Sequence, residues 1–331
     1  MNKLSAIVFT LLSFNVFAIR PLDRFDQWVS KFNIKLMDSD HRAHVISNWL
    51  SNDNYIEYIN NKNVSYKLEH NHFSGLNSLE FKEFLGFDHE FTLTYNQKQT
   101  VKYDVPESIN WVEKGGVTAV KDQGQCGSCW SFSTTGALEG AYFVKYNELP
   151  SFSEQQLVDC DTFRNGGKDM GCNGGLMDNA FSWISKNDGL CTEAEYPYTS
   201  GVTKTSGTCQ TTCQNEKNSG IKSFVDVTPS SDNDMMSALA QQPVSIAIQA
   251  DQKDFQLYSS GVFTGECGTG LDHGVLAVGY GTSSGEDFYL VKNSWSSSWG
   301  DNGYIKLGRG PQYNNGDGQC GMLLQASYPV L

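Results

Sequence analysis

Apolar residues change their spacing along the chain, and this change separates an N-terminal region from the rest. Between residue 19 and about residue 100 the spacing is helical but interrupted: one face carries Phe25, Trp28, Val29 and Phe32, and another carries Trp49, Ile56 and Ile59. This spacing predicts amphipathic helices in an otherwise polar segment. Residues 95–105 are polar, have no period and lead to Pro106, so we interpret them as a linker.

Beyond residue 105 a helical pattern is followed by strand-like ones. The stretch SCWSFSTTGALEGAYFVKY, which begins at Ser128, has apolar residues at helical spacing and predicts a buried helix with Cys129 at its N-terminus. Further along, Val244, Ile246 and Ile248 alternate, and short apolar runs occupy 274–278 and 288–291, as is typical of strands. Helices first and strands later predict an α+β protein with two lobes.

The first 18 residues, MNKLSAIVFTLLSFNVFA, combine the positive charge of Lys3 with an apolar run and a cleavage pattern that ends at Ala18. The run is too short and too lightly flanked for a membrane span, so we expect a signal peptide. No later stretch approaches 18 apolar residues, and we expect no membrane association after the signal peptide is removed.

The charge balance excludes one large class of function. The chain of 331 residues has 24 Lys and Arg against 37 Asp and Glu, a net charge of −13. No basic stripe is available to neutralise phosphates, which argues against nucleic-acid binding. The glycines between 265 and 285 lack the strand–helix context of a nucleotide-binding loop.

Nine cysteines all follow residue 125: Cys126, Cys129, Cys160, Cys172, Cys191, Cys209, Cys213, Cys267 and Cys320. In an oxidising compartment eight can pair and one thiol is left over. The pair Cys126-x-x-Cys129 could be half of a zinc site, a redox dithiol, two unrelated disulfide halves, or a bridged cysteine beside a reactive one.

Two of these interpretations lack support elsewhere in the chain. Zinc needs a second ligand pair of similar spacing, but Cys160 and Cys172 are twelve residues apart, and Cys209-x-x-x-Cys213 has no plausible histidine. A redox dithiol would come with a compact βαβ pattern, which we do not find. We therefore expect neither a metal nor another cofactor.

A reactive cysteine needs a lowered pKa and a base. The positive end of a helix favours a thiolate at Cys129. Five of the six histidines lie in the cysteine-free N-terminal region: His41, His44, His70, His72 and His89. Any Cys/His catalysis in the cysteine-rich region must therefore use His273.

Four sequence blocks resemble those of the papain family of cysteine proteases and occur in the same order. They are QGQCGSCW (123–130), GCNGG (171–175), LDHGVLAVGYG (271–281) and KNSWSSSWGDNGY (292–304). The resemblance covers residues 105–331, and GCNGGLMD is similar to the cathepsin L branch. It implies a papain-like two-lobe fold, with a helical lobe, a β-barrel-like lobe and an active-site cleft between them.

This resemblance implies a cysteine endopeptidase, since no insertion is large enough to occlude the cleft. Cys129 would be the nucleophile and His273 its base, in a thiolate–imidazolium pair. Asn293 would orient the imidazole, and Trp295 would shield that hydrogen bond from water. Gln123 would donate to the oxyanion together with the backbone N–H of Cys129. The alternative is a catalytically silent relative that acts as a binding or inhibitory protein.

Substrate contacts are implied in the same way. Gly174 and Gly175 would bind peptide backbone. The main specificity pocket, which takes the side chain just before the cleaved residue, would be lined by Leu176, Met177, Ala247, Leu271, Gly274 and Gln325, and Asp272 is also assigned to substrate binding. An apolar lining favours Leu, Phe or Val, and the polar Gln325 is expected to relax that preference.

The resemblance also implies cysteine pairings. Cys126 would bridge Cys172, and Cys267 would bridge Cys320. Cys160 would pair with Cys209 or Cys213, and Cys191, an addition to the family pattern, with whichever of the two remains. These alternatives stay open, and Cys129 is the thiol left over.

Residues 19–104 resemble the family's inhibitory propeptide in part. Its interspersed motif is matched by Trp49, Asn52, Ile56 and Asn60, and a shorter motif by Asn71, His72 and Phe73. However, His41 and Val45 stand where the family has Glu and Arg, and Gly75 stands where an Asp is usual. A permanent N-terminal helical domain is the alternative.

The implied partners are protein and peptide substrates, the chain's own propeptide as an intramolecular inhibitor, and cystatin-like inhibitors. The implied location is the secretory pathway, in lysosome-like vesicles or outside the cell. Asn63, in Asn63-Val64-Ser65, is the one glycosylation candidate.

Overall fold

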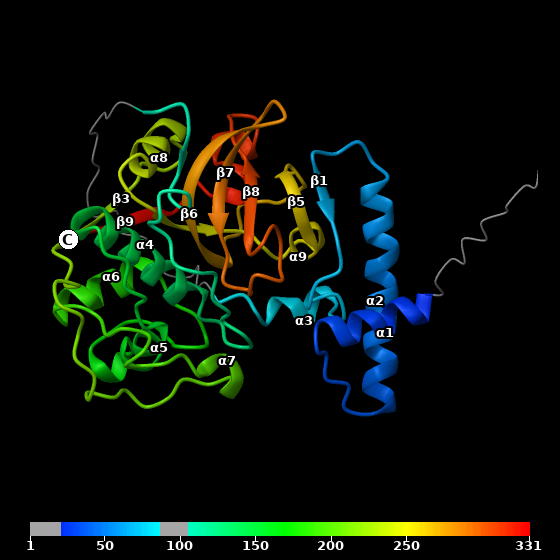
Figure 1. Ribbon diagram of the computed structural model, residues 1–331, viewed down its shortest axis with the longest axis horizontal. Coiled ribbons are helices and arrows are strands. Elements are labelled where there is room, and N and C mark those ends of the chain that lie inside the picture. The colour runs from blue at the N-terminus through cyan, green and yellow to red at the C-terminus, as the bar shows by residue number, and fades with distance from the viewer. Residues whose placement is uncertain (1–20, 87–104) are drawn as a thin grey trace, which may run out of the picture.

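The structure is a computed structural model that describes residues 21–86 and 105–331. The expected signal peptide and most of the expected linker lie outside these residues. Figure 1 shows three parts side by side, with the helices between residues 129 and 239 on one side, most strands of the C-terminal half in the middle, and the N-terminal segment against these strands on the other side.

The helices of the N-terminal segment are α1 (Pro21–Lys31), α2 (Ser39–Asn60) and α3 (Ser78–Lys82). The α-helices that follow are α4 (Cys129–Tyr146), α5 (Glu154–Cys160), α6 (Met177–Lys186), α7 (Ser200–Thr203), α8 (Asp232–Leu239) and α9 (Lys253–Gln256). Short 3₁₀ turns are η1 (Phe163–Asn165), η2 (Asn314–Gly316) and η3 (Gln319–Gly321).

The strands form one mixed sheet with the open order β1-β5-β8-β7-β6-β4-β9-β3, and β2 adds to β6. Their bounds are β1 (Tyr66–Leu68), β2 (Ile109–Asn110), β3 (Ser223–Asp226), β4 (Val244–Ile248), β5 (Tyr258–Phe263), β6 (His273–Ser283), β7 (Glu286–Lys292), β8 (Tyr304–Gly308) and β9 (Ala326–Val330). The predicted strands at 244–248, 274–278 and 288–291 are all present. All five residues of β4 are buried, because this strand is covered on both faces.

The predicted helix at Cys129 is α4, and it is buried from Cys129 to Tyr142. Two glycines let it approach the strand region closely: a Cβ at Gly140 would lie 2.4 Å from Cγ of Pro243, and one at Gly136 would lie 2.8 Å from a methyl of Leu276. Ser133 Oγ also donates to the carbonyl of Val275 at 2.7 Å. Cys129 is thus held rigidly against the start of β6.

The N-terminal segment has a small core of its own, formed by Phe25, Trp28, Val45 and Trp49. Gly75 packs on this core, since a Cβ there would lie 2.9 Å from Cη2 of Trp28 and 2.9 Å from the Cγ1 methyl of Val45. Two of the three departures from the propeptide motif, Gly75 and Val45, therefore meet each other. An apolar contact occupies the place where charged residues are usual.

Polar residues of the propeptide-like motif join this segment to the rest of the chain. Asn60 is bonded to Leu68 through both its amide and its carbonyl oxygen, which fixes the turn from α2 to β1. β1 then pairs antiparallel with β5, with Tyr66 opposite Gly261. Asn71 Nδ2 donates to the carbonyl of Gln256 at 2.8 Å. The N-terminal segment is therefore an edge addition to the sheet.

Candidate active site

Cys129 is the one free cysteine of the described residues and is fully buried. The disulfides are Cys126–Cys172, Cys160–Cys209, Cys191–Cys213 and Cys267–Cys320. They include both pairs that the family resemblance implies, and they choose between the alternatives that the sequence leaves open. Because Cys126 is bridged, the C-x-x-C stretch is neither a dithiol nor a zinc ligand pair.

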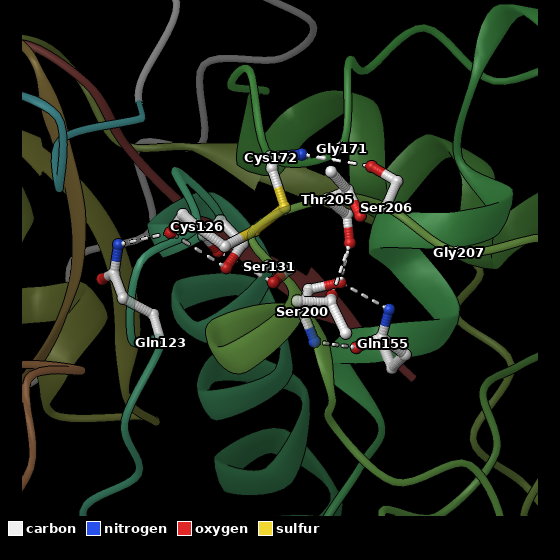
Figure 2. The surroundings of a disulfide bond; sticks show 12 residues. Gln123, Cys126, Ser131, Gln155, Gly171, Cys172, Ser200, Thr205, Ser206 and Gly207 are labelled. Carbon is white, nitrogen blue, oxygen red and sulfur yellow. Dashed lines mark hydrogen bonds between the residues drawn. A yellow bond between two sulfur atoms is a disulfide. The ribbon is translucent and has the colours of Figure 1, made fainter.

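The bridge from Cys126 to Cys172 ties the loop before α4 to the loop that contains Gly174 and Gly175 (Figure 2). A hydrogen bond from Gly127 N to the carbonyl of Cys172, at 3.0 Å, reinforces it. The two loops are therefore fixed to each other directly before the helix that begins at Cys129.

His273 lies at the start of β6, opposite Ile248 of β4. Its Nε2 lies 2.8 Å from Asn293 Oδ1, which also accepts from Ser294 N at 2.8 Å. Because Asn293 Oδ1 is a carbonyl oxygen, it can only accept a hydrogen bond from the imidazole. Nε2 of His273 therefore carries the hydrogen, and Nδ1 has the free lone pair. Within residues 21–86 and 105–331, Nδ1 has no hydrogen-bond partner.

Trp295 stacks on the imidazole of His273, with ring centroids 4.5 Å apart and planes 23° apart. The indole is 1% exposed. It covers one face of the ring that is bonded to Asn293, where the resemblance implies that it shields this hydrogen bond from water.

Gln123 is brought to the same site from the loop before α4. Its Oε1 accepts from Ser294 Oγ at 2.7 Å, so its Nε2 must face the other way. Nε2 donates to the carbonyl of Cys126 at 3.0 Å and to that of Phe84 at 2.9 Å. Ser294 was not picked out from the sequence, although it lies inside the block KNSW and follows Asn293 directly.

The chain's own residues 84–86 lie over the thiol. The backbone amide of Gly175 donates to the carbonyl of Gly86 at 3.3 Å, and the carbonyl of Phe84 accepts from the side-chain amide of Gln123. A Cβ on Gly86 would lie 2.1 Å from the backbone oxygen of Gly127, so only glycine fits at this position. The Gly175 amide is expected to bind substrate backbone and the Gln123 side-chain amide an oxyanion, and both are hydrogen-bonded to residues 84–86 instead.

Burial under this segment sets the protonation of the site. Burial raises the pKa of the Cys129 thiol to about 11, although hydrogen bonds from the backbones of Gly274, Gly86 and Trp130 oppose the rise. Burial also lowers the pKa of His273 to about 4, against the effect of Asn293. The thiolate expected from the helix N-terminus is therefore not the favoured form here, because desolvation outweighs the helix end.

The residues expected at the substrate cleft converge around Gly274. Gly274 pairs with Ala247, and a Cβ on it would lie 3.2 Å from Met177 Sδ. The carbonyl of Gln325 accepts from Ala247 N at 2.9 Å, and its side chain is half-buried. Leu176 and Leu271 are buried nearby in the same core cluster.

Two further substrate-site residues have clear structural constraints. A Cβ on Gly175 would lie 2.7 Å from the ring of Trp130, so the close approach requires glycine. Gly174 has a φ of +113°, which also favours glycine. Asp272 accepts from Ala250 N at 2.7 Å, and burial raises its pKa to about 7.

Two findings bear on other kinds of site. Across residues 21–86 and 105–331, no three His, Cys, Asp or Glu side chains are grouped so that they could hold a metal ion. None of the helices in the described part of the chain has the length and apolar character needed to cross a membrane.

Comparison with known proteins agrees with this geometry. The model of the papain family of cysteine proteases matches residues 105–330, and that of the cathepsin propeptide inhibitor domain matches residues 25–81. The cysteine proteinase RD21A of Arabidopsis thaliana is 44% identical over 302 residues, which are 89% of this chain and 62% of that protein. The chain thus spans about three fifths of the length of this relative.

Two other proteins match over more of their own length. The KDEL-tailed cysteine endopeptidase CEP2 of Arabidopsis thaliana is 43% identical over 92% of this chain and 85% of its own. The solved structure of a recombinant stem bromelain precursor superposes with a TM-score of 0.84 at 35% identity, over 94% of this chain and 99% of that one. The chain therefore belongs to the papain family of cysteine proteases and carries a cathepsin propeptide inhibitor domain before its peptidase domain.

Proposed function

We propose that the chain is the zymogen of a cysteine endopeptidase in which residues 1–18 are a signal peptide, residues 19–104 an inhibitory propeptide and residues 105–331 the peptidase domain. The observation that carries this proposal is the convergence of Cys129, His273, Asn293 and Gln123 beneath residues 84–86. A propeptide that occupies the groups expected to bind substrate is the arrangement of an enzyme held inactive.

Removal of the propeptide readmits water and lowers the cost of charge at the site. The thiol proton of Cys129 then passes to Nδ1 of His273, and the imidazolium stays oriented by Asn293. The thiolate attacks the peptide carbonyl carbon, and the oxyanion accepts hydrogen bonds from Gln123 Nε2 and the Cys129 backbone N–H. His273 returns the proton to the leaving amine, which leaves a thioester on Cys129.

Water completes the cycle. His273 takes a proton from a water molecule that attacks the thioester carbonyl, and the thiol leaves with that proton. Trp295 contributes by keeping other water from the bond between His273 and Asn293, and it touches no reacting atom.

Substrate selection follows from the residues around Gly274. Gly174 and Gly175 bind extended peptide backbone, and the amide of Gly175 already binds the carbonyl of Gly86 in this manner. Leu176, Met177, Ala247 and Leu271 give the pocket an apolar lining that favours Leu, Phe or Val, with Asp272 at its side. Gln325 adds tolerance for polar side chains. A Gln325→Ala variant with an unchanged cleavage profile would contradict that role.

The chemistry also suggests where the protein acts and what it meets. A signal peptide and four disulfides fit the secretory pathway, with lysosome-like vesicles or the cell exterior as the destination. Asn63 is exposed on the turn after α2, where it is open to glycosylation. Cystatin-like inhibitors are expected to bind the cleft that protein substrates use.

Acidification of the purified full-length chain in the presence of a thiol tests the proposal. We expect loss of the propeptide, with cleavage between about residues 101 and 106, and the appearance of peptide hydrolysis. The Cys129→Ala variant should keep its fold and hydrolyse nothing. Loss of the propeptide without peptidase activity in the unmodified chain would favour the catalytically silent alternative.

A further inference from the structure

The phenol of Tyr198 lies between the two halves of the proposed oxyanion hole. Its hydroxyl donates to the backbone carbonyl of Gln123 at 2.8 Å, and it lies 2.7 Å from the hydroxyl of Ser128. Gln123 provides the side-chain donor of the hole, and Ser128 directly precedes Cys129, which provides the backbone donor. One hydroxyl thus contacts the residue that holds one donor and the residue directly before the one that holds the other.

The direction of these bonds follows from counting hydrogens. A phenol has one hydrogen, and the carbonyl of Gln123 can only accept it. The Ser128 hydroxyl must then donate to the oxygen of Tyr198. Burial raises the pKa of Tyr198, so the phenol keeps its hydrogen at acidic and neutral pH.

Tyr198 is itself held in place from α5. Oε1 of Gln155 accepts from Thr199 N at 2.7 Å and from Ser200 N at 3.0 Å. Nε2 of Gln155 donates to Ser200 Oγ at 2.7 Å (Figure 2). Because Gln155 is 2% exposed, these bonds form a rigid support for the two residues that directly follow the tyrosine.

Two more contacts lock the same segment to the active-site loop. Gln125 N donates to the carbonyl of Gly201 at 2.9 Å, and the ring of Tyr198 packs edge-on against Phe132, with centroids 4.9 Å apart. The side chain of Gln123 is fixed separately, by Ser294. The carbonyl of Ser294 also accepts from Gln123 N at 2.8 Å. Ser294 therefore holds the side chain and the N–H of Gln123, whereas Tyr198 holds its carbonyl.

We propose that Tyr198 is a positioning residue for the oxyanion hole: its hydroxyl sets the distance between the Gln123 amide donor and the Cys129 backbone donor. This inference rests on the proposed peptidase function. Donors of an oxyanion hole must match the position of the developing charge closely, so a small shift of either one weakens stabilisation of the transition state.

The test compares two reactions of Cys129 in the acid-activated enzyme. Hydrolysis of a peptide amide forms an oxyanion, whereas alkylation by iodoacetamide is a displacement that forms none. In Tyr198→Phe we expect kcat for amide hydrolysis to fall about tenfold, which is the size expected for one or two lost hydrogen bonds. KM and the rate of alkylation should stay within about twofold of wild type. A merely structural role would lower both rates together.

Tyr196→Phe is the matched control, because Tyr196 is also a buried phenol but its hydroxyl donates to Asp159 at 2.8 Å, away from the hole. It should leave the ratio of the two rates unchanged. Should Tyr198→Phe fail to fold, Ser128→Ala removes one of the two bonds and should give the same split at smaller size.

A double-mutant cycle identifies the route of the effect. If Tyr198 acts through Gln123, the tenfold loss should shrink to about threefold or less in a Gln123→Ala background. Full additivity, an unchanged kcat in Tyr198→Phe, or equal losses in both reactions would overturn the inference. An inactive wild-type enzyme would instead overturn the proposed function, so the two failures can be told apart.

Discussion

The propeptide and the peptidase domain are stabilised in different ways. The peptidase domain has four disulfides and a single large core, on which buried residues of the propeptide such as Tyr66, Phe73 and Phe81 also pack. The propeptide has no cysteine, and its own core is a cluster around Trp28 and Trp49. The propeptide is therefore held by packing and hydrogen bonds without a disulfide, whereas the peptidase domain is cross-linked.

The two regions also differ in how they respond to acid. In the propeptide, burial alone would raise the pKa of Glu80, but hydrogen bonds from Asn77 and His44 lower it overall. In the peptidase domain, burial first and the charge of Asp226 second raise the pKa of Asp178 to about 7. Acid therefore weakens a contact in the propeptide and favours the folded peptidase domain. Acid can therefore destabilise the propeptide through protonation of Glu80, although Gly75 and Val45 replace the charged residues usual in the family.

The largest expected effect concerns Cys129 itself. At pH 6 a buried thiol of pKa about 11 is almost entirely protonated, so we expect the zymogen to react with iodoacetamide at least about a thousandfold more slowly than the activated enzyme. Mass spectrometry of the labelled thiol measures both rates. Comparable rates would mean that residues 84–86 do not cover the site in solution.

Removing an aromatic anchor of the propeptide comes next. Phe73 packs edge-on against Trp295, with centroids 5.2 Å apart, and is 2% exposed. Phe73→Ala should cost about 3–5 kcal/mol of propeptide docking, as for other buried Phe-to-Ala changes. Leu79→Ala on α3 is the control, since Leu79 is 78% exposed. Inhibition of the activated enzyme by each propeptide variant added separately measures the difference.

Removal of the disulfide from Cys191 to Cys213 tests how the peptidase domain is stabilised. The bridged residues are 22 positions apart, and opening a loop of this length costs about 3 kcal/mol through the entropy of the unfolded chain. Replacing both cysteines by alanine should lower the thermal midpoint of the peptidase domain and leave the midpoint of the propeptide unchanged. Equal shifts in both regions would contradict their independent stabilisation.

Asp178→Asn addresses the pH response of the peptidase domain. The folded pKa of about 7 exceeds the ordinary value of 3.8, so the native state binds the extra proton and stability is lost as pH rises from about 4 to about 7. Asparagine keeps a polar group beside Ser327 Oγ, which donates to Asp178 at 2.6 Å. We expect the variant to lose a pH dependence of about 4 kcal/mol in chemical unfolding, and Glu148→Gln, at an exposed acid, to retain it.

Glu80→Gln should have the smallest effect, because Glu80 is partly exposed. Its pKa is lowered on folding, so its contribution is present above the ordinary value of 4.5 and is lost as pH falls below it. The variant should release its propeptide at a higher pH than wild type. Glu57→Gln, at an exposed position on α2, should activate at the wild-type pH. An unchanged activation profile in Glu80→Gln would place the acid response elsewhere.

Much of the molecule could be predicted from local pattern and counting. The spacing after Ser128 predicted α4, and the alternation at 244–248 predicted β4, because helix and strand periods follow from backbone geometry alone. An odd cysteine count predicted one free thiol, and the distribution of histidines left His273 as its only available base.

Other features required the tertiary structure, because they depend on distance and burial between residues far apart in the chain. The choice of Cys209 over Cys213 as the partner of Cys160, the contact of Gly75 with Val45, and the contacts of Tyr198 are of this kind. So is the neutral state of the site, where desolvation by burial outweighs the hydrogen bonds to the Cys129 thiol. The sequence by itself determined which groups can react, and only the fold decided that in this form they are held uncharged.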